Sequence, residues 1–156
     1  MKRILIGIDD SKFADHAAAY GFKLARHLQA AVGLVHIIEP AVIPAVNSAM
    51  DPGLGLPVEN NELLAADMMN IQDKRSRQIL DATIKKYAGE LNITVFEEYG
   101  STADGIIECS KEFKADMIVI GTHSRTGLDR FFMGSVAEQV VRHSPIPVLV
   151  VPMKNE

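Results

Sequence analysis

Five short apolar runs, rich in β-branched residues, alternate along the chain with segments whose apolar residues recur every three or four positions. The runs are typical of strands buried on both faces, and the segments between them of helices with one apolar face. The third run alternates more than the others, which favours a place near a sheet edge. We predict strands at residues 3–9, 31–38, 93–99, 116–120 and 148–151, and helices beginning near residues 11, 59, 101 and 134.

The residues around these segments suggest where the helices begin and end. Ser11 is expected to cap the first helix, and Ser101 with Asp104 resembles a capping box with Asp in place of Glu. A long helix is predicted over residues 59–89, ended by a glycine. Its polar run at residues 74–77, Lys-Arg-Ser-Arg, is expected to face solvent.

The alternation of strands and helices predicts an α/β fold, a single open five-stranded parallel sheet with helices on both faces, which is Rossmann-like. We expect residues 1–156 to form one domain, with a loop rich in Pro and Gly at residues 40–58. Parallel sheets bind ligands at the carboxyl ends of their strands. Here those ends are predicted at residues 9–11, 37–40, 99–102 and from 121 onward.

Composition narrows the function classes. The net charge of −4 over 156 residues argues against a surface built for nucleic acid. The apolar runs are too short to span a membrane, and the start has no signal-peptide pattern. The single cysteine, Cys109, is expected to be a small core residue and fits a reducing compartment. We therefore expect a cytoplasmic protein.

A segment at residues 120–135 has the composition of a phosphate cradle between a strand and a helix. Gly121 allows close approach of a ligand, and Gly134 and Ser135 begin a helix whose N–H groups and dipole attract anions. Thr122 and Ser124 can hydrogen-bond phosphate or ribose, while Arg125 and Arg130 can neutralise phosphate charge. The alternatives are an ordinary strand-to-helix loop and two solvated surface arginines.

Candidate residues at the other strand ends complete the predicted site. Asp9 can accept hydrogen bonds from a ribose or an adenine amino group, or help to hold a metal; its alternative role is a helix cap. Ile8 and Ile37 can form the apolar walls that an adenine ring needs, and they can equally be core residues.

Several common sites have no motif in this sequence. It lacks the Walker-type phosphate loop, GxGxxG after the first strand, and the GxSxG elbow of hydrolases. The five histidines have no metal-ligand spacing with Cys or Glu partners, so we expect no metal site. Little catalytic apparatus is visible, so we expect at most weak catalysis.

Three segments carry a family resemblance: the cradle, residues 135–151 after it, and the opening Ile-Leu-Ile-Gly-Ile-Asp-Asp-Ser of residues 4–11. The sequence resembles the universal stress protein family in these segments and over nearly the whole chain. Members that bind ATP carry the motif Gx2Gx9G[ST]. Gly121, Gly134 and Ser135 match it at this spacing, and Ser124 stands in place of its second glycine. The resemblance also implies a fold like that of adenine nucleotide alpha hydrolases.

The resemblance further implies a homodimer that pairs through the final strand, Val148–Val151. It implies ATP, with or without Mg²⁺, as a regulatory or slowly hydrolysed ligand. Because Ser124 has a Cβ where the motif has glycine, the alternative is a dimeric stress-response interaction module that binds no nucleotide. The implied adenine and ribose contacts are Gly7, Ile8, Asp9 and Ile37, and the implied phosphate and ribose contacts are Gly121, Thr122, Ser124, Arg125, Gly134, Ser135 and Val136.

Overall fold

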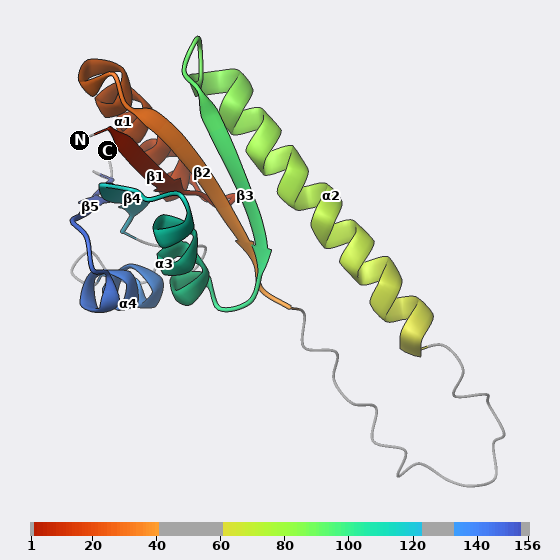
Figure 1. Ribbon diagram of the computed structural model, residues 1–156. Helices are drawn as coiled ribbons and strands as arrows, with labels where there is room; N and C mark the ends of the chain where they lie inside the picture. The colour runs from red at the N-terminus through yellow and green to blue at the C-terminus, as the bar shows by residue number, and fades with distance from the viewer. Residues whose placement is uncertain (1, 41–60, 123–132, 154–156) are drawn as a thin grey trace, which may run out of the picture.

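Strands and helices alternate along the chain, as the apolar pattern predicts (Figure 1). The computed structural model describes residues 2–40, 61–122 and 133–153. The predicted Pro/Gly-rich loop lies outside the described residues except for its first residue. In chain order the elements are β1 (Arg3–Gly7), α1 (Lys12–Leu28), β2 (Ala31–Ile38), α2 (Asn61–Tyr87), β3 (Ile93–Tyr99), α3 (Thr102–Glu112), β4 (Met117–Gly121), α4 (Ser135–His143) and β5 (Val148–Val151).

The five strands form one sheet in the order β3-β2-β1-β4-β5, and every neighbouring pair is parallel. This confirms the predicted fold class and places β3 at an edge, as its alternating pattern indicates. The connections from β1 to β3 move along the sheet in one direction, and the connection from β3 to β4 carries the chain to the other side of β1. The topological switch point therefore lies between β1 and β4, where ligands bind in open parallel sheets.

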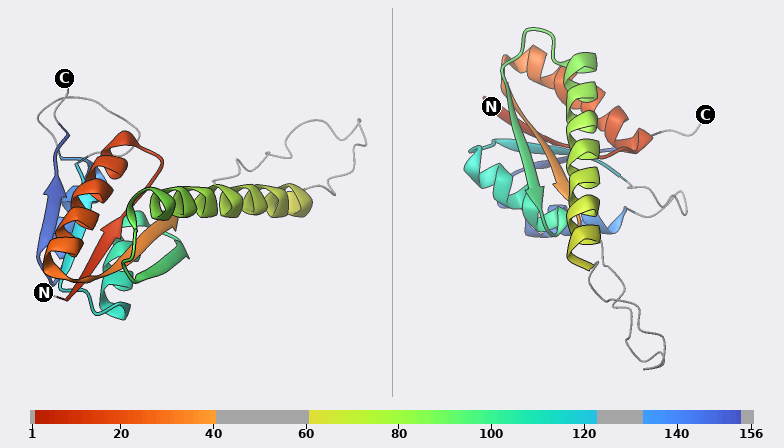
Figure 2. Two further views of the ribbon diagram at one scale, coloured as in Figure 1. Left: turned by 90° about the horizontal axis from the view of Figure 1, so that it is seen from above. Right: turned by 90° about the vertical axis from the view of Figure 1, so that its right-hand side faces the viewer.

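Alternate residues of the central strands pack on opposite faces of the sheet. Ile4 and Ile6 of β1 belong to a core with side chains of α1 and α2, while Leu5 belongs to a second core with side chains of α3 and α4. The helices α1 and α2 thus lie on one face of the sheet and α3 and α4 on the other (Figures 1 and 2). Burial on both faces explains why the strands are apolar at nearly every position.

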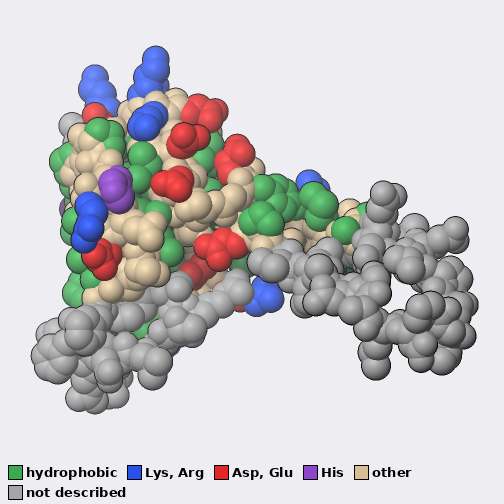
Figure 3. Space-filling model, turned by 90° about the horizontal axis from the view of Figure 1, so that it is seen from below, with side chains coloured by type: hydrophobic (Ala, Val, Ile, Leu, Met, Phe, Trp, Pro, Cys, Tyr) green, Lys and Arg blue, Asp and Glu red, His purple; other side chains and the backbone are tan. Residues whose placement is uncertain are grey.

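The N-terminal part of α2 extends beyond the sheet (Figures 1 and 2). Its side chains Met68, Met69 and Ile71 are exposed. A space-filling view from below shows hydrophobic side chains on the part of this helix that leaves the body of the molecule (Figure 3). No helix in the described ranges is both long and apolar enough to cross a membrane.

The two predicted helix caps differ in outcome. Ser11 caps α1, since its hydroxyl oxygen accepts a hydrogen bond from the backbone N–H of Ala14 at 3.1 Å. Ser101 occupies the N-cap position of α3 but makes no side-chain cap hydrogen bond, so the predicted capping box is wrong. The start of α3 is instead tied to the end of β2, because the Thr102 hydroxyl donates to the Glu39 carboxylate.

Candidate functional site

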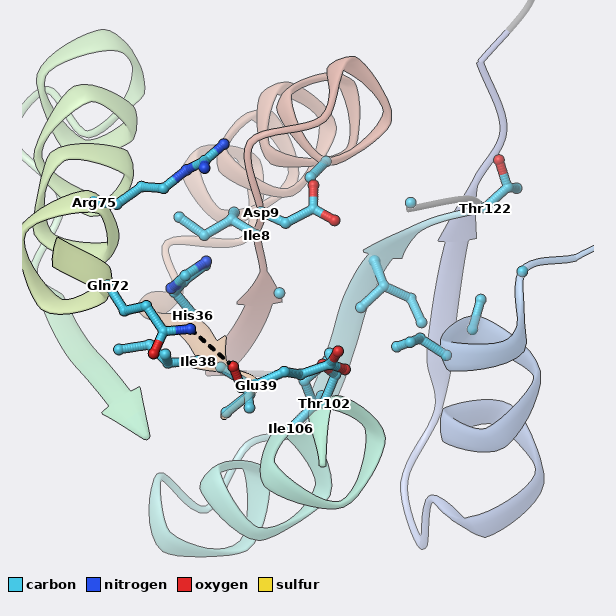
Figure 4. Close-up of a pocket in the computed structure, with 18 residues that line it drawn as sticks. Ile8, Asp9, His36, Ile38, Glu39, Gln72, Arg75, Thr102, Ile106 and Thr122 are labelled. Atoms are coloured by element: carbon cyan, nitrogen blue, oxygen red, sulfur yellow. Dashed lines mark hydrogen bonds between the residues drawn. The ribbon is translucent and has the colours of Figure 1, made fainter. Parts of the chain in front are cut away.

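A pocket of about 300 Å³ lies at the carboxyl ends of β1, β2 and β4, beside the switch point (Figure 4). Its volume is at the lower end of the range of about 300–1,000 Å³ usual for small-molecule sites. Residues from all four helices complete it. The described lining residues are Gly7, Ile8, Asp9, Ala14, His36, Ile37, Ile38, Glu39, Gln72, Arg75, Thr102, Ile106, Ile120, Gly121, Thr122, Gly134, Val136 and Ala137.

The structure brings most of the sequence-predicted site residues together around this one pocket. Ser135 begins α4 next to two lining residues but does not itself line the pocket. Ser124 and Arg125 lie outside the described residues. The predicted residues that line the pocket are Gly7, Ile8, Asp9, Ile37, Gly121, Thr122, Gly134 and Val136.

The first turn of α4 offers hydrogen-bond donors at one end of the pocket. The N–H of Gly134 donates to Thr122 O at 2.7 Å, so this group is already used, contrary to the expectation that Gly134 offers a free donor. The first intrahelical bond runs from Glu138 N to Gly134 O, and among the described residues no side-chain cap of this helix is seen. The N–H groups of Ser135 to Ala137 therefore precede the hydrogen-bonded ladder, at the positive end of the helix dipole. An anion is the matching ligand.

Gly121 has a packing role that the cradle pattern does not reveal. A Cβ at this position would lie 2.8 Å from the backbone oxygen of Phe13 and 2.9 Å from its carbonyl carbon. Such contacts are too short for real side chains, and backbone atoms cannot easily move away. The missing side chain thus allows the end of β4 to approach the start of α1, which forms one wall of the pocket.

Asp9 lines the pocket and follows the end of β1 by two residues (Figure 4). One carboxylate oxygen, Oδ1, accepts a hydrogen bond from the backbone N–H of Ser11 at 2.8 Å. Asp9 thus shapes the turn into α1 and lines the pocket, whereas the cap of the helix is Ser11. Anchoring through Oδ1 fixes the carboxylate, which can offer its second oxygen to a hydroxyl group.

Apolar side chains from both cores form walls of the pocket. Ile8 belongs to the core beneath α1 and α2, while Ile37 and Ile106 belong to the core beneath α3 and α4. Ile8 and Ile37 are therefore core residues and pocket walls at once. A flat aromatic base suits such walls, because its faces lose water against aliphatic carbon.

The wall formed by α2 was not predicted. His36 and Ser76 are buried there, and their Nδ1 and Oγ atoms lie 2.8 Å apart in a hydrogen bond. Arg75 lines the pocket and pairs with Asp10. The expectation that residues 74–77 face solvent is therefore wrong for Ser76, which is 0% exposed, and incomplete for Arg75. Polar residues lie here because this part of α2 passes over strand ends, where the apolar core stops.

Comparisons with known proteins agree with this architecture. The model of the universal stress protein family matches residues 1–152. The chain belongs to the universal stress protein family. Universal stress protein MJ0531 of Methanocaldococcus jannaschii is 31% identical over 152 residues, which cover 96% of this chain and 81% of the relative.

Two solved universal stress protein structures share the fold. UspA from Lactobacillus plantarum aligns with a TM-score of 0.77 at 18% identity, over 96% of this chain and 97% of the other. The protein from Archaeoglobus fulgidus in complex with dAMP aligns with a TM-score of 0.59 at 17% identity, over 96% of this chain and 97% of the other. At these identities the two structures support the fold alone.

For this universal stress protein, topology explains some of the lining residues that motif reasoning missed. Ile38, Glu39 and Thr102 lie at strand ends, so the rule for parallel sheets already indicates their neighbourhood. Gln72 and Arg75 lie in the middle of a long helix, and no local signal marks them. Their position depends on how α2 crosses the sheet, which only the assembled fold determines.

Outside the pocket, the described ranges contain neither a metal site nor a reactive cysteine. They contain no cluster of three or more His, Cys, Asp or Glu residues arranged to hold a metal ion. Cys109 is buried in the core beneath α3 and α4, as expected. Burial raises the pKa of its thiol to about 11, with Glu98 as a further cause. The neutral thiol is a poor nucleophile and acts here as a small apolar side chain.

Proposed function

We propose that this universal stress protein binds ATP, with or without Mg²⁺, as a regulatory or slowly hydrolysed ligand. One observation carries the proposal: a single pocket runs from the first turn of α4, past Asp9, to the apolar side chains of Ile8 and Ile37. Phosphate, ribose and base follow one another in the same order in an adenine nucleotide. The dAMP complex of the Archaeoglobus fulgidus relative supports a nucleotide of this class.

The backbone of Ile37 supports the placement of the base at the end of β2. Val35 O accepts a hydrogen bond from Ile8 N at 2.9 Å, whereas Ile38 O accepts one from Gly100 N on the β3 side. Successive residues of a strand direct their backbone groups to opposite sides, so those of Ile37 point to the side of β1. Because β1 ends at Gly7, these groups meet the pocket, where they can pair with a base edge.

The proposed ligand contacts follow from this order. The carboxylate of Asp9 is the acceptor for a ribose hydroxyl or a partner for Mg²⁺, and the first turn of α4 receives the phosphates. Base and ribose are assigned to Gly7, Ile8, Asp9 and Ile37, and phosphate and ribose to Gly121, Thr122, Ser124, Arg125, Gly134, Ser135 and Val136.

Isothermal titration calorimetry of the purified protein with ATP tests this function. We expect saturable binding with one site per chain, and no detectable binding at millimolar ATP would overturn the proposal. The competing function is a dimeric interaction module that binds no nucleotide, because Ser124 replaces the motif glycine. If only the Ser124→Gly variant binds ATP, the interaction module is the better description.

Further parts of the proposal concern turnover and assembly. We infer a cytoplasmic homodimer of single-domain chains, residues 1–156, that pair through the edge strand β5. Within the part of the chain that the structure describes, β5 has a strand neighbour on one side only, so its other edge can pair with a second copy. A phosphate-release assay tests the expectation of slow hydrolysis, and turnover at the rates of ordinary ATPases would contradict a regulatory role.

A further inference from the structure

The order of the strands assigns one end of the pocket to the base. Along the sheet, Thr122 follows β4, Asp9 follows β1 and Glu39 follows β2, with α2 beyond them (Figure 4). This inference rests on the proposed function, in which phosphates lie at α4 and ribose lies at Asp9. The base must then lie over the end of β2, between the β-strand termini and α2.

One side chain of α2 is held at this end of the pocket. Gln72 is half-buried, lines the pocket, and donates a hydrogen bond from Nε2 to the backbone oxygen of Glu39 at 3.1 Å (Figure 4). One helical turn later, the hydrogen bond between Ser76 and His36 fixes the same face of α2 against β2. Arg75, paired with Asp10, ties the helix to the start of α1. The amide of Gln72 is therefore positioned through three separate contacts of α2.

We propose that Gln72 is a specificity-determining residue that recognises the 6-position of the purine base. Its amide keeps one N–H and the Oε1 acceptor after bonding to Glu39 O. A glutamine amide matches adenine, since it can accept from the 6-amino group while it donates to the neighbouring ring nitrogen. A 6-oxo purine presents an acceptor to Oε1, which leaves two oxygens facing each other and removes the amide–base pair.

Binding of ATP and ITP by the full chain tests this inference, since the two bases differ at the 6-position and in the protonation of the adjacent ring nitrogen. We expect the wild-type protein to prefer ATP by about tenfold or more, as one good amide–base pair allows. Gln72→Met keeps the length of the side chain and its helix propensity but removes the amide. The preference should fall to within about twofold, mainly because ATP binds more weakly.

Gln78→Met is the matched control, because Gln78 is exposed on the same helix. It should keep the wild-type preference. A second variant, Gln72→Leu, and the thermal midpoint of each protein separate loss of the amide from loss of folding. A Gln72→Met protein that folds and retains the full preference for ATP overturns the inference while leaving the proposed function intact. A wild-type protein that binds neither nucleotide overturns both.

Discussion

The side chain of Ile37 fills the space that a Cβ on Gly105 would need. A Cβ built at Gly105, in the first turns of α3, would lie 2.6 Å from Cδ1 of Ile37 and 3.0 Å from its Cγ1. Ile37 also lines the pocket, at the end where we place the base. Because Gly105 has no side chain, the side chain of Ile37 can pack against α3 and leave more room in the pocket.

Substitution of Gly105 by Ala is expected to weaken ATP binding by about tenfold, because Ile37 must shift and the end of a branched side chain can move toward the pocket. The free energy of unfolding should change by less than about 1 kcal/mol, since alanine improves the helix while the contact with Ile37 worsens. Calorimetry and urea unfolding measure the two quantities. Glu108→Ala, at an exposed position of α3, is the control and should keep wild-type affinity. Unchanged affinity in Gly105→Ala would show that Ile37 does not limit the site.

Two glycines of the proposed phosphate cradle should respond differently to alanine. Gly121→Ala places a Cβ against the backbone of Phe13, so it should destabilise the fold by about 1–3 kcal/mol or more without any nucleotide present. Gly134 has φ −59° and ψ 153°, which any residue adopts, so Gly134→Ala should affect unfolding by less than about 1 kcal/mol while it weakens ATP binding. Urea unfolding of both variants checks this, and equal losses of stability would contradict it.

The extents of the strands could be predicted well from the sequence because their apolar runs end abruptly at polar, Gly or Pro residues. The runs at 31–38, 93–99 and 148–151 coincide with β2, β3 and β5. β1 is two residues shorter than predicted, since Asp9 and Ser11 turn the chain into α1 directly after the strand. The switch point then followed from topology, which is why most predicted site residues meet at one pocket.

Details that depend on side-chain geometry or on distant segments could not be predicted. A capping pattern shows that a serine is present at the N-cap position. It does not show whether the hydroxyl of Ser101 adopts the rotamer that makes the cap hydrogen bond. The polar sequence around Ser76 matches a solvated helix face, yet Ser76 is buried because His36 lies opposite it on β2. Such pairings involve residues far apart in the chain, and a periodic pattern within one helix contains no information about them.

The two N-cap serines provide a direct comparison of cap energies. Ser11→Ala should lower the free energy of unfolding by about 1 kcal/mol, because it removes the acceptor for the N–H of Ala14. Ser101→Ala should cost less than about 0.5 kcal/mol, since this exposed side chain makes no cap hydrogen bond. Chemical denaturation of both variants measures the difference. Equal losses would mean that Ser101 caps α3 in solution.

The raised pKa of Cys109 predicts a loss of stability at alkaline pH. The ordinary thiol pKa is near 9.0 and burial raises it to about 11, so the native state keeps its proton where the unfolded chain has lost it. The stability is thus complete below pH 9 and declines as the pH rises toward about 11. Denaturation of wild type and Cys109→Ala across this range should show a steeper decline in the wild type. Parallel curves would indicate that the thiol does not titrate in this way.

The ladder between β4 and β5 indicates which backbone groups of β5 face the open edge. Ile118 N donates to Pro147 O at 3.0 Å, and alternate residues of a strand face the same neighbour, so Leu149 faces β4 and Val150 faces outward. Val150→Pro removes an outward N–H and should convert the proposed dimer into a monomer of 17.0 kDa, as measured by light scattering. Val150→Thr keeps that N–H and should remain dimeric, whereas Leu149→Pro breaks the ladder to β4 and should destabilise the fold itself. A Val150→Pro protein that is still dimeric would place the interface elsewhere.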